Sequence, residues 1–581
     1  MEKRVIVTML VMMGFFMAVS FIYPLIFPPT EVPVDGASNS TPSASFEATT
    51  LEGGASANSS SAEESETLLP PRAITVSTPL YRAVFTEDGG RLLSLSLNKY
   101  KTYKLRPSDP DTQQELVNIP ENADNYPLNL LFVNNRNETQ DLKNLRFQAD
   151  VESVQVTEGE TKILTFSTST PAGLSITRSF TFSSDNYVIK QKVTLKNSGN
   201  VLFEGRLGQA ISAWPYSIQQ NRYNVLAGYI NRSFISESVD DAQSELSSIG
   251  LITAAGFMGY MDQYFLSAFV FGGESQSPAP THQDLANLKF MGGELPGLGV
   301  RISTFWPLKL SPQDERTYDF DFFYGPKDTN VLIAAGHDLP RSVDLGWFDF
   351  LGRPLGFFLR LFYGFVGNYG VAIILVTILI KICLWPLTAK SYKSMKEMQK
   401  LQPQMQRIRE QYKDNPQAMN QEMLKMYKTH KVSPLGGCLP MVLQIPFFIA
   451  FYRVLDYALE LRGAPFALWI HDLSAPDRLF YFNFSIPFVA PPTGIPVLTL
   501  IMGATMIWQQ RMTPTMGDPL QAKIMMFLPL IFIVALLNMP AGLVLYWLVN
   551  NILSILQQKL INRSKNSKNI KKGQVRTPKK A

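Results

Sequence analysis

The sequence predicts a polytopic α-helical membrane protein with six spans, a large all-β domain outside the membrane and a helical hairpin in the cytoplasm. Apolar stretches alternate with polar ones, as in chains that cross a bilayer several times. About 250 residues consist of short runs in which apolar and polar residues alternate, as half-buried strands require. The formal net charge of +5 is unevenly distributed, because residues 390–431 and 559–580 are basic while residues 31–66 are acidic and serine-rich. Membrane and soluble parts must therefore alternate along the 581 residues.

Residues that hold metals, nucleotides or disulfides are scarce in this chain. The two cysteines, Cys383 and Cys438, lie inside apolar stretches, so neither a disulfide framework nor a zinc site is expected. No metal-binding spacing occurs among the four histidines, which are His282, His337, His430 and His471. The phosphate-binding pattern GxxxxGK[ST] does not occur, which argues against an ATPase. We therefore expect no cofactor.

The first element is an N-terminal transmembrane anchor at residues 1–27. Its apolar run continues from Val5 through Phe27, and Lys3 and Arg4 should stay in the cytoplasm. A cleavable signal peptide is the alternative, because residues 18–20 loosely resemble a cleavage site; the run is too long for such a peptide, which favours the anchor. Residues 28–71 are rich in Ser, Thr, Ala, Pro and acidic residues, and we expect a disordered linker outside the membrane.

Residues 72–340 are predicted to form a large antiparallel β-sandwich. In the run near residue 180, four apolar residues fall on alternate positions and so share one face of a strand: Leu174, Ile176, Phe180 and Phe182. After a turn at 183–186, residues 187–196 alternate again, with the lysines on the outer face. Residues 318–322 repeat the pattern, and Asp319 and Asp321 are expected to face outward. Binding of sugars or partners is possible for such a domain, but no residue cluster selects a ligand, so a scaffold role is favoured.

Residues 341–366 are predicted to form an amphipathic helix that lies in the membrane interface. Aromatic residues such as Trp347 and Phe350 mix with Arg353 and Arg360, and Gly and Pro interrupt the run. Recurring charges suit an interfacial helix better than a spanning one. This helix leads directly into the second transmembrane helix, at 367–387.

Residues 388–433 are predicted to form a cytoplasmic helical hairpin. Met398 and Met405 are seven residues apart, which indicates a short seam of the coiled-coil type. Asn415 and Pro416 are suited to cap and begin the second arm, while Pro403 should kink or restart the first. The methionines of both arms are explained most simply by packing between the arms, and contact with varied apolar partners is the alternative.

The remaining spans are predicted at 434–460, 495–510, 524–539 and 543–558, with a periplasmic connection at 461–494 and a cytoplasmic loop at 511–523. Three of these spans are shorter than the roughly 20 residues that cover the hydrocarbon core. Short spans thin the bilayer around them or admit water. Counting from a cytoplasmic N-terminus places every basic segment inside, including the tail at 559–581, in agreement with the positive-inside rule.

Lys381 is the one cation within the apolar run 369–387. A charge in a membrane helix is costly and is retained mainly where water or a partner reaches it, which makes Lys381 a candidate functional residue. The alternative is that its side chain extends to the basic segment that begins at Lys390. Other polar residues in the spans either line the same interior or form bonds between helices: Gln444, Gln510, Asn550 and Asn551.

Two classes of function fit these features. A transporter or channel would move a polar solute past Lys381 and should show repeated halves, but the sequence contains no convincing internal repeat. A device that handles membrane proteins would offer a wet groove to the polar part of a polypeptide and a thinned bilayer to its apolar part. The second class uses both the buried cation and the short spans.

Three long segments carry a resemblance to a known family. They are KVSPLGGCLPMVLQIPFFIAFYRVL at 431–455, APFALWIHDLSAPD at 464–477 and FLPLIFIVALLNMPAGLVLYWLVNNILSILQQ at 527–558. The chain from about 344 to 563 resembles the YidC/Oxa family of membrane-protein insertases, in its Gram-negative bacterial form. The outer β domain is similar to that family's periplasmic supersandwich in position and pattern. The resemblance implies a five-helix insertase core in the cell inner membrane, with both termini in the cytoplasm.

The resemblance also implies a function and a set of site residues. Nascent membrane proteins would be inserted and helped to fold without nucleotide hydrolysis, alone or with the Sec translocon, so no enzyme is expected. By motif position, Lys381 is the cation of a hydrated groove, where the family usually has arginine; lysine keeps the charge and loses the planar fork of donors. Groove positions are Lys381, Thr377, Gln444, Gln510, Tyr546 and Trp547, and substrate-sliding positions are Met441 and Phe448. At 547 the family often has tyrosine, so a hydroxyl role does not carry over.

Partners follow from the same resemblance. The hairpin at 388–433 and the basic tail would bind the ribosome and the signal recognition particle or its receptor, and the charge of the tail suits polyanions. Solubility or orientation explains the tail equally well. The outer segment 478–492 is longer than the connection that the family usually has, and nothing in the sequence explains it.

Overall fold

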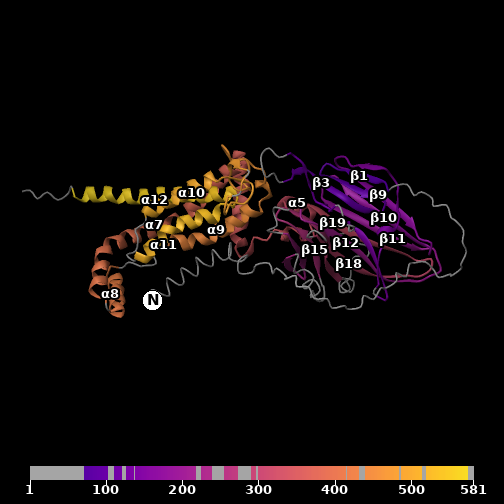
Figure 1. Ribbon diagram of the computed structural model, residues 1–581, viewed down its shortest axis with the longest axis horizontal. Coiled ribbons are helices and arrows are strands. Elements are labelled where there is room, and N and C mark those ends of the chain that lie inside the picture. The colour runs from indigo at the N-terminus through magenta and orange to yellow at the C-terminus, as the bar shows by residue number, and fades with distance from the viewer. Residues whose placement is uncertain are drawn as a thin grey trace, which may run out of the picture.

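The computed structural model describes residues 71–102, 110–120, 126–136, 138–216, 224–238, 254–272, 289–295, 299–413, 415–430, 439–482, 484, 486–512 and 519–573. The predicted anchor at 1–27, and the predicted linker except its last residue, lie outside the described residues. The described chain forms two bodies, a β domain and a bundle of helices, which lie end to end in an elongated molecule (Figure 1).

The β domain consists of three sheets, in which every pairing is antiparallel except that of β1 with β8. One sheet has the order β4 (Gln113–Glu115), β3 (Arg91–Lys101), β2 (Tyr81–Thr86), β1 (Ala73–Ser77), β8 (Ser153–Gln155). The largest has the order β14 (Ser233–Ser238), β13 (Val225–Ile230), β15 (Ala255–Met261), β16 (Phe265–Val270), β19 (Glu315–Pro326), β11 (Val188–Asn197), β10 (Leu174–Ser183), β9 (Thr161–Ser169), β7 (Gln148–Ala149). The third has the order β17 (Lys289–Leu295), β18 (Gly299–Leu310), β12 (Phe203–Ala213), β5 (Asn129–Asn134), β6 (Thr139–Asp141). One continuous hydrophobic core joins residues of all three sheets.

The alternating pattern near residue 180 forms the strands that it predicts. Along β10, every second residue from Leu174 to Phe182 is buried, and the lysines of β11 point outward. The turn between the two strands is closed by Asn186, whose side chain accepts a hydrogen bond from the backbone N–H of Val188. Asp321 lies opposite the exposed Lys190 and so shares the outer face of the sheet, but its side chain is buried there, which the pattern did not predict.

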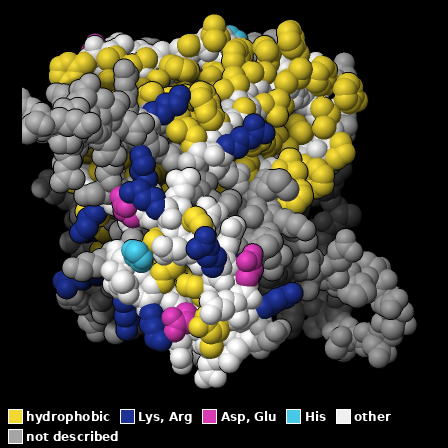
Figure 2. All heavy atoms as spheres, turned by 90° about the vertical axis from the view of Figure 1, so that its left-hand side faces the viewer, with side chains coloured by type: hydrophobic (Ala, Val, Ile, Leu, Met, Phe, Trp, Pro, Cys, Tyr) yellow, Lys and Arg dark blue, Asp and Glu magenta, His cyan; other side chains and the backbone are white. Residues whose placement is uncertain are grey.

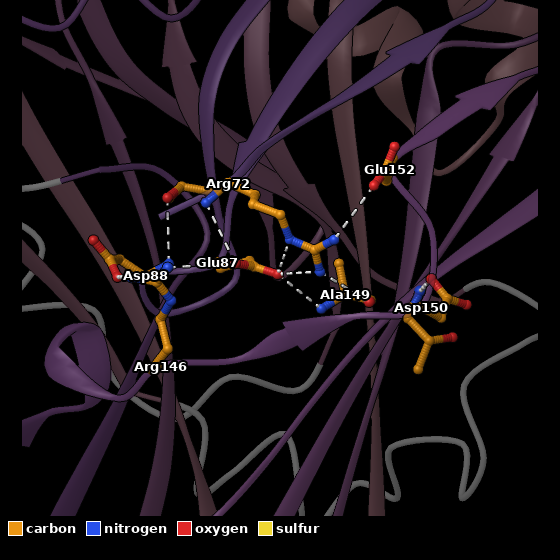
Figure 3. Close-up of polar contacts among 9 residues, drawn as sticks. Arg72, Glu87, Asp88, Arg146, Ala149, Asp150 and Glu152 are labelled. Carbon is orange, nitrogen blue, oxygen red and sulfur yellow. Dashed lines mark hydrogen bonds and ion pairs between the residues drawn. The ribbon is translucent and has the colours of Figure 1, made fainter. Parts of the chain in front are cut away.

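The β domain begins with an anchored arginine (Figure 3). The Arg72 guanidinium donates two hydrogen bonds to Oε1 of Glu87, at 2.6 and 2.9 Å, and the backbone N–H of Ala149 donates to the same oxygen. Burial alone raises the pKa of Glu87, but the bonds from Arg72 and from the backbone of Ala149 outweigh it and lower that pKa. A half-exposed Arg146 completes the cluster by contacting Glu87 and Asp88. These contacts hold the N-terminal end of β1 in place.

The helical body contains six long helices and a shorter one within the described residues, which are listed here in chain order: α6 (Asp349–Val366), α7 (Tyr369–Gln411), α8 (Pro416–Thr429), α9 (Leu439–Tyr457), α10 (Val497–Met512), α11 (Pro519–Leu536) and α12 (Ala541–Gly573). Between the two bodies lie α5 (Thr329–Ala335) and the single turns η4 (Leu339–Ser342) and η5 (Gly346–Phe348). A two-stranded hairpin, β20 (Leu479–Phe482) and β21 (Thr493–Ile495), lies between α9 and α10 in the chain. The remaining turns are η2 (Leu142–Asn144) and η7 (Leu459–Leu461).

The helix α7 differs from its prediction in length. It continues without a break through Pro386 and Pro403, so the segments predicted as the second transmembrane helix and as the first arm of the hairpin are one helix of 43 residues. A restart at Pro403 was therefore wrong. Each proline removes only one backbone donor, and both prolines are exposed, while buried residues such as Leu384 and Leu401 keep the other face of α7 packed. The predicted cap of the second arm is confirmed, because the Asn415 side chain accepts from the backbone N–H of Ala418 and Pro416 begins α8.

Helix ends also differ from the predicted loop and tail. Residues 511–512 belong to α10 and residues 519–523 to α11, so part of the loop predicted at 511–523 is helical. The tail predicted from 559 is helical as far as Gly573. By length and composition, α7 is the one helix within the described ranges that is long and apolar enough to cross a membrane, and a shorter apolar stretch, Phe527–Leu536, lies in α11. The count of six spans stays a prediction.

Buried polar groups join the β domain to the helical body. The Gln263 amide donates to the backbone carbonyl of Asp456, at the end of α9. The Arg462 guanidinium donates to Oε1 of Gln114 at 2.8 Å, and it lies over the ring of Phe265. On the β-domain side, the Lys327 ammonium donates to the Asp262 carbonyl at 3.0 Å, and it also lies over the ring of Tyr457 of α9. We call Gln263, Asp456, Arg462, Gln114, Lys327 and Asp262 the junction cluster.

Candidate functional site

The candidate site lies where four helices of the bundle meet. In the packing of the bundle, α12 contacts α7 and α10, and α9 contacts α7. Figure 1 shows these helices running side by side. Their apolar contacts form a single core that contains Ile373, Val376 and Ile380 of α7 with Val544 and Tyr546 of α12. Positions one helical turn apart on α7 therefore point into the bundle, and Thr377 and Lys381 follow the same face.

The Lys381 ammonium lies inside this bundle. Lys381 is only 9% exposed. Its Nζ donates hydrogen bonds to Oγ of Ser554 at 2.7 Å and to Oε1 of Gln444 at 3.4 Å. The Ser554 hydroxyl in turn donates to the backbone carbonyl of Asn550 at 2.7 Å. One side chain of α7 is thus bound to α9 and α12 at once.

The charge of Lys381 has no anionic partner among the described residues. Both hydrogen-bond acceptors are neutral oxygens, and none of the ion pairs within the described ranges includes Lys381. An ammonium has three donors, and two are used here. A buried charge with neutral partners only is incompletely compensated. The site can therefore stabilise an additional acceptor, and an anionic one most strongly.

Polar contacts continue from Lys381 toward the α7–α8 hairpin. Two turns further along α7, the Thr388 hydroxyl accepts a hydrogen bond from Nε2 of Gln557 at 2.6 Å and donates to the Leu384 carbonyl at 3.0 Å. Both α7 and α12 run in the same direction here, because Lys381 pairs with Ser554 and Thr388 with Gln557. We call Lys381, Thr388, Gln444, Ser554 and Gln557 the polar track.

Aromatic side chains occupy the other end of the site. The ring of Tyr546 lies 6.1 Å from that of Phe448 and 5.2 Å from that of Phe451, and its hydroxyl lies next to the Gln444 side chain. Trp547 packs against Phe448 and Phe532, with ring centroids 4.6 and 5.1 Å away. The polar track is therefore closed by packed rings on the side away from the hairpin.

The structure brings some of the predicted site residues together and leaves others apart. Gln444 contacts Lys381, and Phe448 joins Tyr546 and Trp547 in the aromatic group. The Thr377 hydroxyl is buried and donates to the Ile373 carbonyl of its own helix at 2.7 Å. Gln510 lies near the end of α10 and is not a partner of Lys381. Met441 belongs to α9, but its side chain is outside the described residues.

Three members of the polar track were not predicted as site residues: Ser554, Gln557 and Thr388. A signal for each of them exists in the sequence. Asn550 was singled out as a polar residue within a span, and Ser554 and Gln557 follow it at intervals of four and three, so all three share one helix face. Thr388 follows Lys381 by seven residues on α7 and shares its face in the same way.

The outer surface of the bundle carries many exposed apolar side chains. On α7 they include Ile382 and Leu387, and the other helices contribute Leu500, Ile501, Ile507, Trp508, Phe527, Leu530, Ile531, Val534, Ile552, Leu556 and Leu560. Figure 2 shows the hydrophobic side chains gathered in the upper part of one end of the molecule, while Lys and Arg side chains gather lower down, where the α7–α8 hairpin lies. An apolar surface of this extent is typical of contact with lipid.

Comparison with known proteins identifies the family. Residues 361–569 match the family described as 60Kd inner membrane protein, and residues 73–358 match the YidC periplasmic domain. The membrane protein insertase YidC of Pelobacter propionicus is 38% identical over 570 residues, which cover 97% of this chain and 99% of that protein. The chain belongs to the YidC family of membrane-protein insertases. A second relative with that name, from Syntrophus aciditrophicus, is 40% identical over 84% of this chain and 85% of its own length.

The YidC family accounts for both bodies of the molecule. Its members are inner-membrane proteins with a periplasmic domain, so the β domain is periplasmic and the helical body is the insertase core. The resemblance that the three long segments carry is confirmed. A solved structure described as an active YidC insertase with its first transmembrane domain resolved aligns with 84% of this chain and 94% of its own, at 19% identity and a TM-score of 0.34.

Proposed function

We propose that this chain inserts nascent inner-membrane proteins through a hydrated groove in which the Lys381 charge receives the polar part of the substrate. The observation that supports the proposal is the pair of neutral acceptors around Nζ, at 2.7 and 3.4 Å. An incoming carboxylate or backbone carbonyl accepts a charge-assisted hydrogen bond from the Lys381 ammonium. This bond replaces the hydrogen bonds to water that the group loses on entry. No bond is made or broken, so the proposal requires no catalytic group.

The polar track gives the substrate's polar end a direction of entry. Thr388 and Gln557 lie between Lys381 and the hairpin, so a short hydrophilic segment that enters from the cytoplasm meets hydroxyl and amide groups before the charge. Burying an amide without a hydrogen bond costs about 1–3 kcal/mol on the scale of protein mutations. Each side chain of the polar track lowers the cost of burying the substrate's polar groups by offering them a hydrogen bond. The packed rings of Phe448 and Tyr546 end it on the periplasmic side.

The apolar part of the substrate leaves along the lipid-facing surface. Ile382 of α7 is exposed one residue from Lys381, so the polar track and the apolar surface lie on adjoining faces of one helix. Burial of apolar area contributes about 25 cal/mol per Å², which drives the segment into lipid. Met441 and Phe448 are proposed sliding positions. Thr377 and Tyr546 are buried in the packed bundle, so they reach a substrate only when the helices separate.

The wider arrangement is part of the same proposal. Six spans with both termini in the cytoplasm place the α7–α8 hairpin and the basic residues that end α12 on the ribosome's side. These parts bind the ribosome and the signal recognition particle or its receptor. The protein acts alone or with the Sec translocon, and it also assists folding of the inserted chain. Lysine at 381 supplies a positive charge without the planar fork of donors that a guanidinium has. Because the proposal needs only the charge, arginine should substitute for lysine there.

The decisive experiment is site-specific photocrosslinking in the full chain. A photoreactive phenylalanine analogue replaces Gln444 or Phe448, and ribosomes stalled on a nascent chain present one transmembrane segment of increasing length. The matched control carries the same analogue at Ile163, an exposed residue of β9. Crosslinks from Gln444 that precede those from Phe448 as the nascent chain lengthens are expected. No crosslink from either position above the Ile163 background overturns the groove proposal and favours solute transport.

Variants of Lys381 test the charge. In proteoliposomes we expect Lys381→Met to reduce insertion of a substrate with an acidic N-terminal region several-fold, and Lys381→Arg to retain it. Lys390→Met, which removes an exposed charge from the same helix, is the matched control and should insert normally. Equal insertion by all three variants would show that no charge at 381 is needed.

A further inference from the structure

The hairpin formed by β20 and β21 lies outside the proposed groove and has no role in it. It lies in the connection between α9 and α10. From Leu479 to Gln510 the sequence contains no Asp, Glu, Lys or Arg. Residues 479–496 of this run form the connection before α10, and the absence of charge there is unusual because exposed connections are normally polar.

One buried arginine holds this hairpin against the bundle. The Arg478 guanidinium donates to the Leu537 carbonyl at 2.8 Å and to Oδ1 of Asn538 at 3.0 Å, both at the turn between α11 and α12. It also donates to the Pro492 carbonyl at 3.2 Å, on the returning half of the segment. A planar group with five donors suits several acceptors at once.

Asn538 adds a second set of bonds to the same segment. Its Oδ1 accepts from the backbone N–H of Ala490 at 2.8 Å, and its Nδ2 donates to the Phe488 carbonyl at 3.0 Å. The backbone of the segment is therefore fixed by Arg478 and Asn538 together. Because the backbone is fixed, the directions of the side chains of this segment are fixed as well.

Three phenylalanines of this fixed segment point away from the protein. Phe480, Phe484 and Phe488 are 66%, 61% and 76% exposed. Full burial of a phenylalanine contributes roughly 1.5–3 kcal/mol, so leaving three in water forgoes a large stabilisation. Grouped exposed aromatic side chains usually mark a surface that contacts lipid or another protein.

The surroundings favour lipid. The hairpin leads directly into α10, whose exposed side chains Leu500 and Ile501 belong to the apolar surface described above. The turn that Arg478 grips ends α11, where Val534 and Ile531 are exposed. The aromatic group therefore continues the lipid-facing surface at its periplasmic end, where aromatic residues concentrate in membrane proteins. A protein partner would be expected to meet some charge at the rim, and this run has none.

We infer that the β20–β21 hairpin inserts Phe480, Phe484 and Phe488 into the headgroup–acyl boundary of the outer leaflet and so fixes the α11–α12 turn at a set depth. The occupant of this apolar face is the bilayer itself. The hairpin acts as a depth anchor on the side of the core opposite the cytoplasmic hairpin. The inference stands whether or not Lys381 receives substrate.

Fluorescence quenching in the full chain tests the inference. Phe484→Cys or Phe488→Cys is made in a Cys383→Ser, Cys438→Ser background, labelled with an environment-sensitive dye and reconstituted in nanodiscs that hold one copy each. Phospholipids with a nitroxide near the headgroup probe contact with lipid, and iodide probes contact with water. Ile163→Cys in β9 is the matched control, because it is an exposed apolar residue of the periplasmic domain. Both test positions are exposed, so the substitutions leave the fold intact.

We expect the nitroxide lipid to quench the dye at 484 and 488 several-fold more than at 163, and iodide to quench it several-fold less. Equal iodide quenching at all three positions would overturn the inference. Protection that is absent in single-copy nanodiscs but present in crowded proteoliposomes would also overturn it, because a second copy would then be the occupant. Proposed insertion through the groove is measured separately and is unaffected by either result.

Discussion

At the scale of single residues, the position of Lys381 distinguishes two explanations of its charge. A lysine that extends toward the cytoplasm would place Nζ near the basic segment from Lys390. Instead Nζ is bound between helices, to Ser554 of α12 and Gln444 of α9. The neutral character of both partners is what makes the site receptive to an anionic or carbonyl oxygen.

The bond from Lys381 to Ser554 leads to a stability prediction. Hydrogen bonds to charged groups contribute about 1.5–3 kcal/mol, so Ser554→Ala should lower the free energy of unfolding of the bundle by about that amount. Thr377→Val is the matched control, because the Thr377 hydroxyl binds only a carbonyl of its own helix and its loss should matter little. Thermal unfolding in detergent measures both. Equal losses for the two variants would show that the Ser554 hydroxyl does not support the charge.

At the scale of elements, the α7–α8 hairpin is held by a small core of its own. Met398, Leu401 and Met405 of α7 pack against Met423 and Met426 of α8. The methionines thus serve the packing between arms that the spacing predicts. The same packing leaves Leu424 exposed on α8.

A core of five buried side chains should be sensitive to the loss of one. Deleting a buried methionine side chain costs about 2–5 kcal/mol in larger cores, and we expect about 2 kcal/mol for Met405→Ala here. The effect should be confined to the hairpin, so hydrogen exchange in α8 accelerates while the β domain is unchanged. Leu424→Ala, at an exposed position of α8, should leave the exchange rates alone. Unchanged exchange in Met405→Ala would mean that the arms are held by other contacts.

At the scale of the whole molecule, the junction cluster fixes the β domain to the insertase core. Lys327 follows β19, and its ammonium lies 5.1 Å from the ring centroid of Tyr457 at the end of α9. Burial lowers the pKa of Lys327 to about 8, although the carboxylates of Asp262 and Asp456 act in the opposite direction. Burial likewise raises the pKa of the Asp262 carboxyl, despite its bonds from the backbone N–H groups of Phe265 and Tyr264.

The lowered pKa of Lys327 predicts a dependence of stability on pH. Below about 8 the lysine is protonated in both states, and its burial penalty is constant. Between that pH and the ordinary value near 10.4, the unfolded chain binds more protons, so the free energy of unfolding rises with pH. Lys327→Met should remove this rise. The measurement is the difference in unfolding free energy between wild type and variant from pH 7 to 9.5, and a difference that does not change with pH would refute the assignment.

The sequence by itself determined the classes of the elements and the family. Alternation around residue 180, the seam of methionines and the cap at Asn415 depend on local spacing and on side-chain chemistry close in the chain, and the structure has all three. The three long segments were enough to indicate the insertase family. Lys381 stood out because one charge in an apolar run is visible without any fold.

Only the tertiary structure decided which residues meet. Ser554 lies 173 positions from Lys381, and no local pattern indicates that they share a hydrogen bond. The helix α7 continues through Pro386 although proline removes a backbone donor, and Asp321 is buried on the outer face of its sheet, and neither outcome follows from the local pattern. The fixed direction of the three hairpin phenylalanines depends on Arg478 reaching the turn after α11. The positions of Ser554 and of the three phenylalanines are set by contacts between distant segments, whose free energy outweighs local preference.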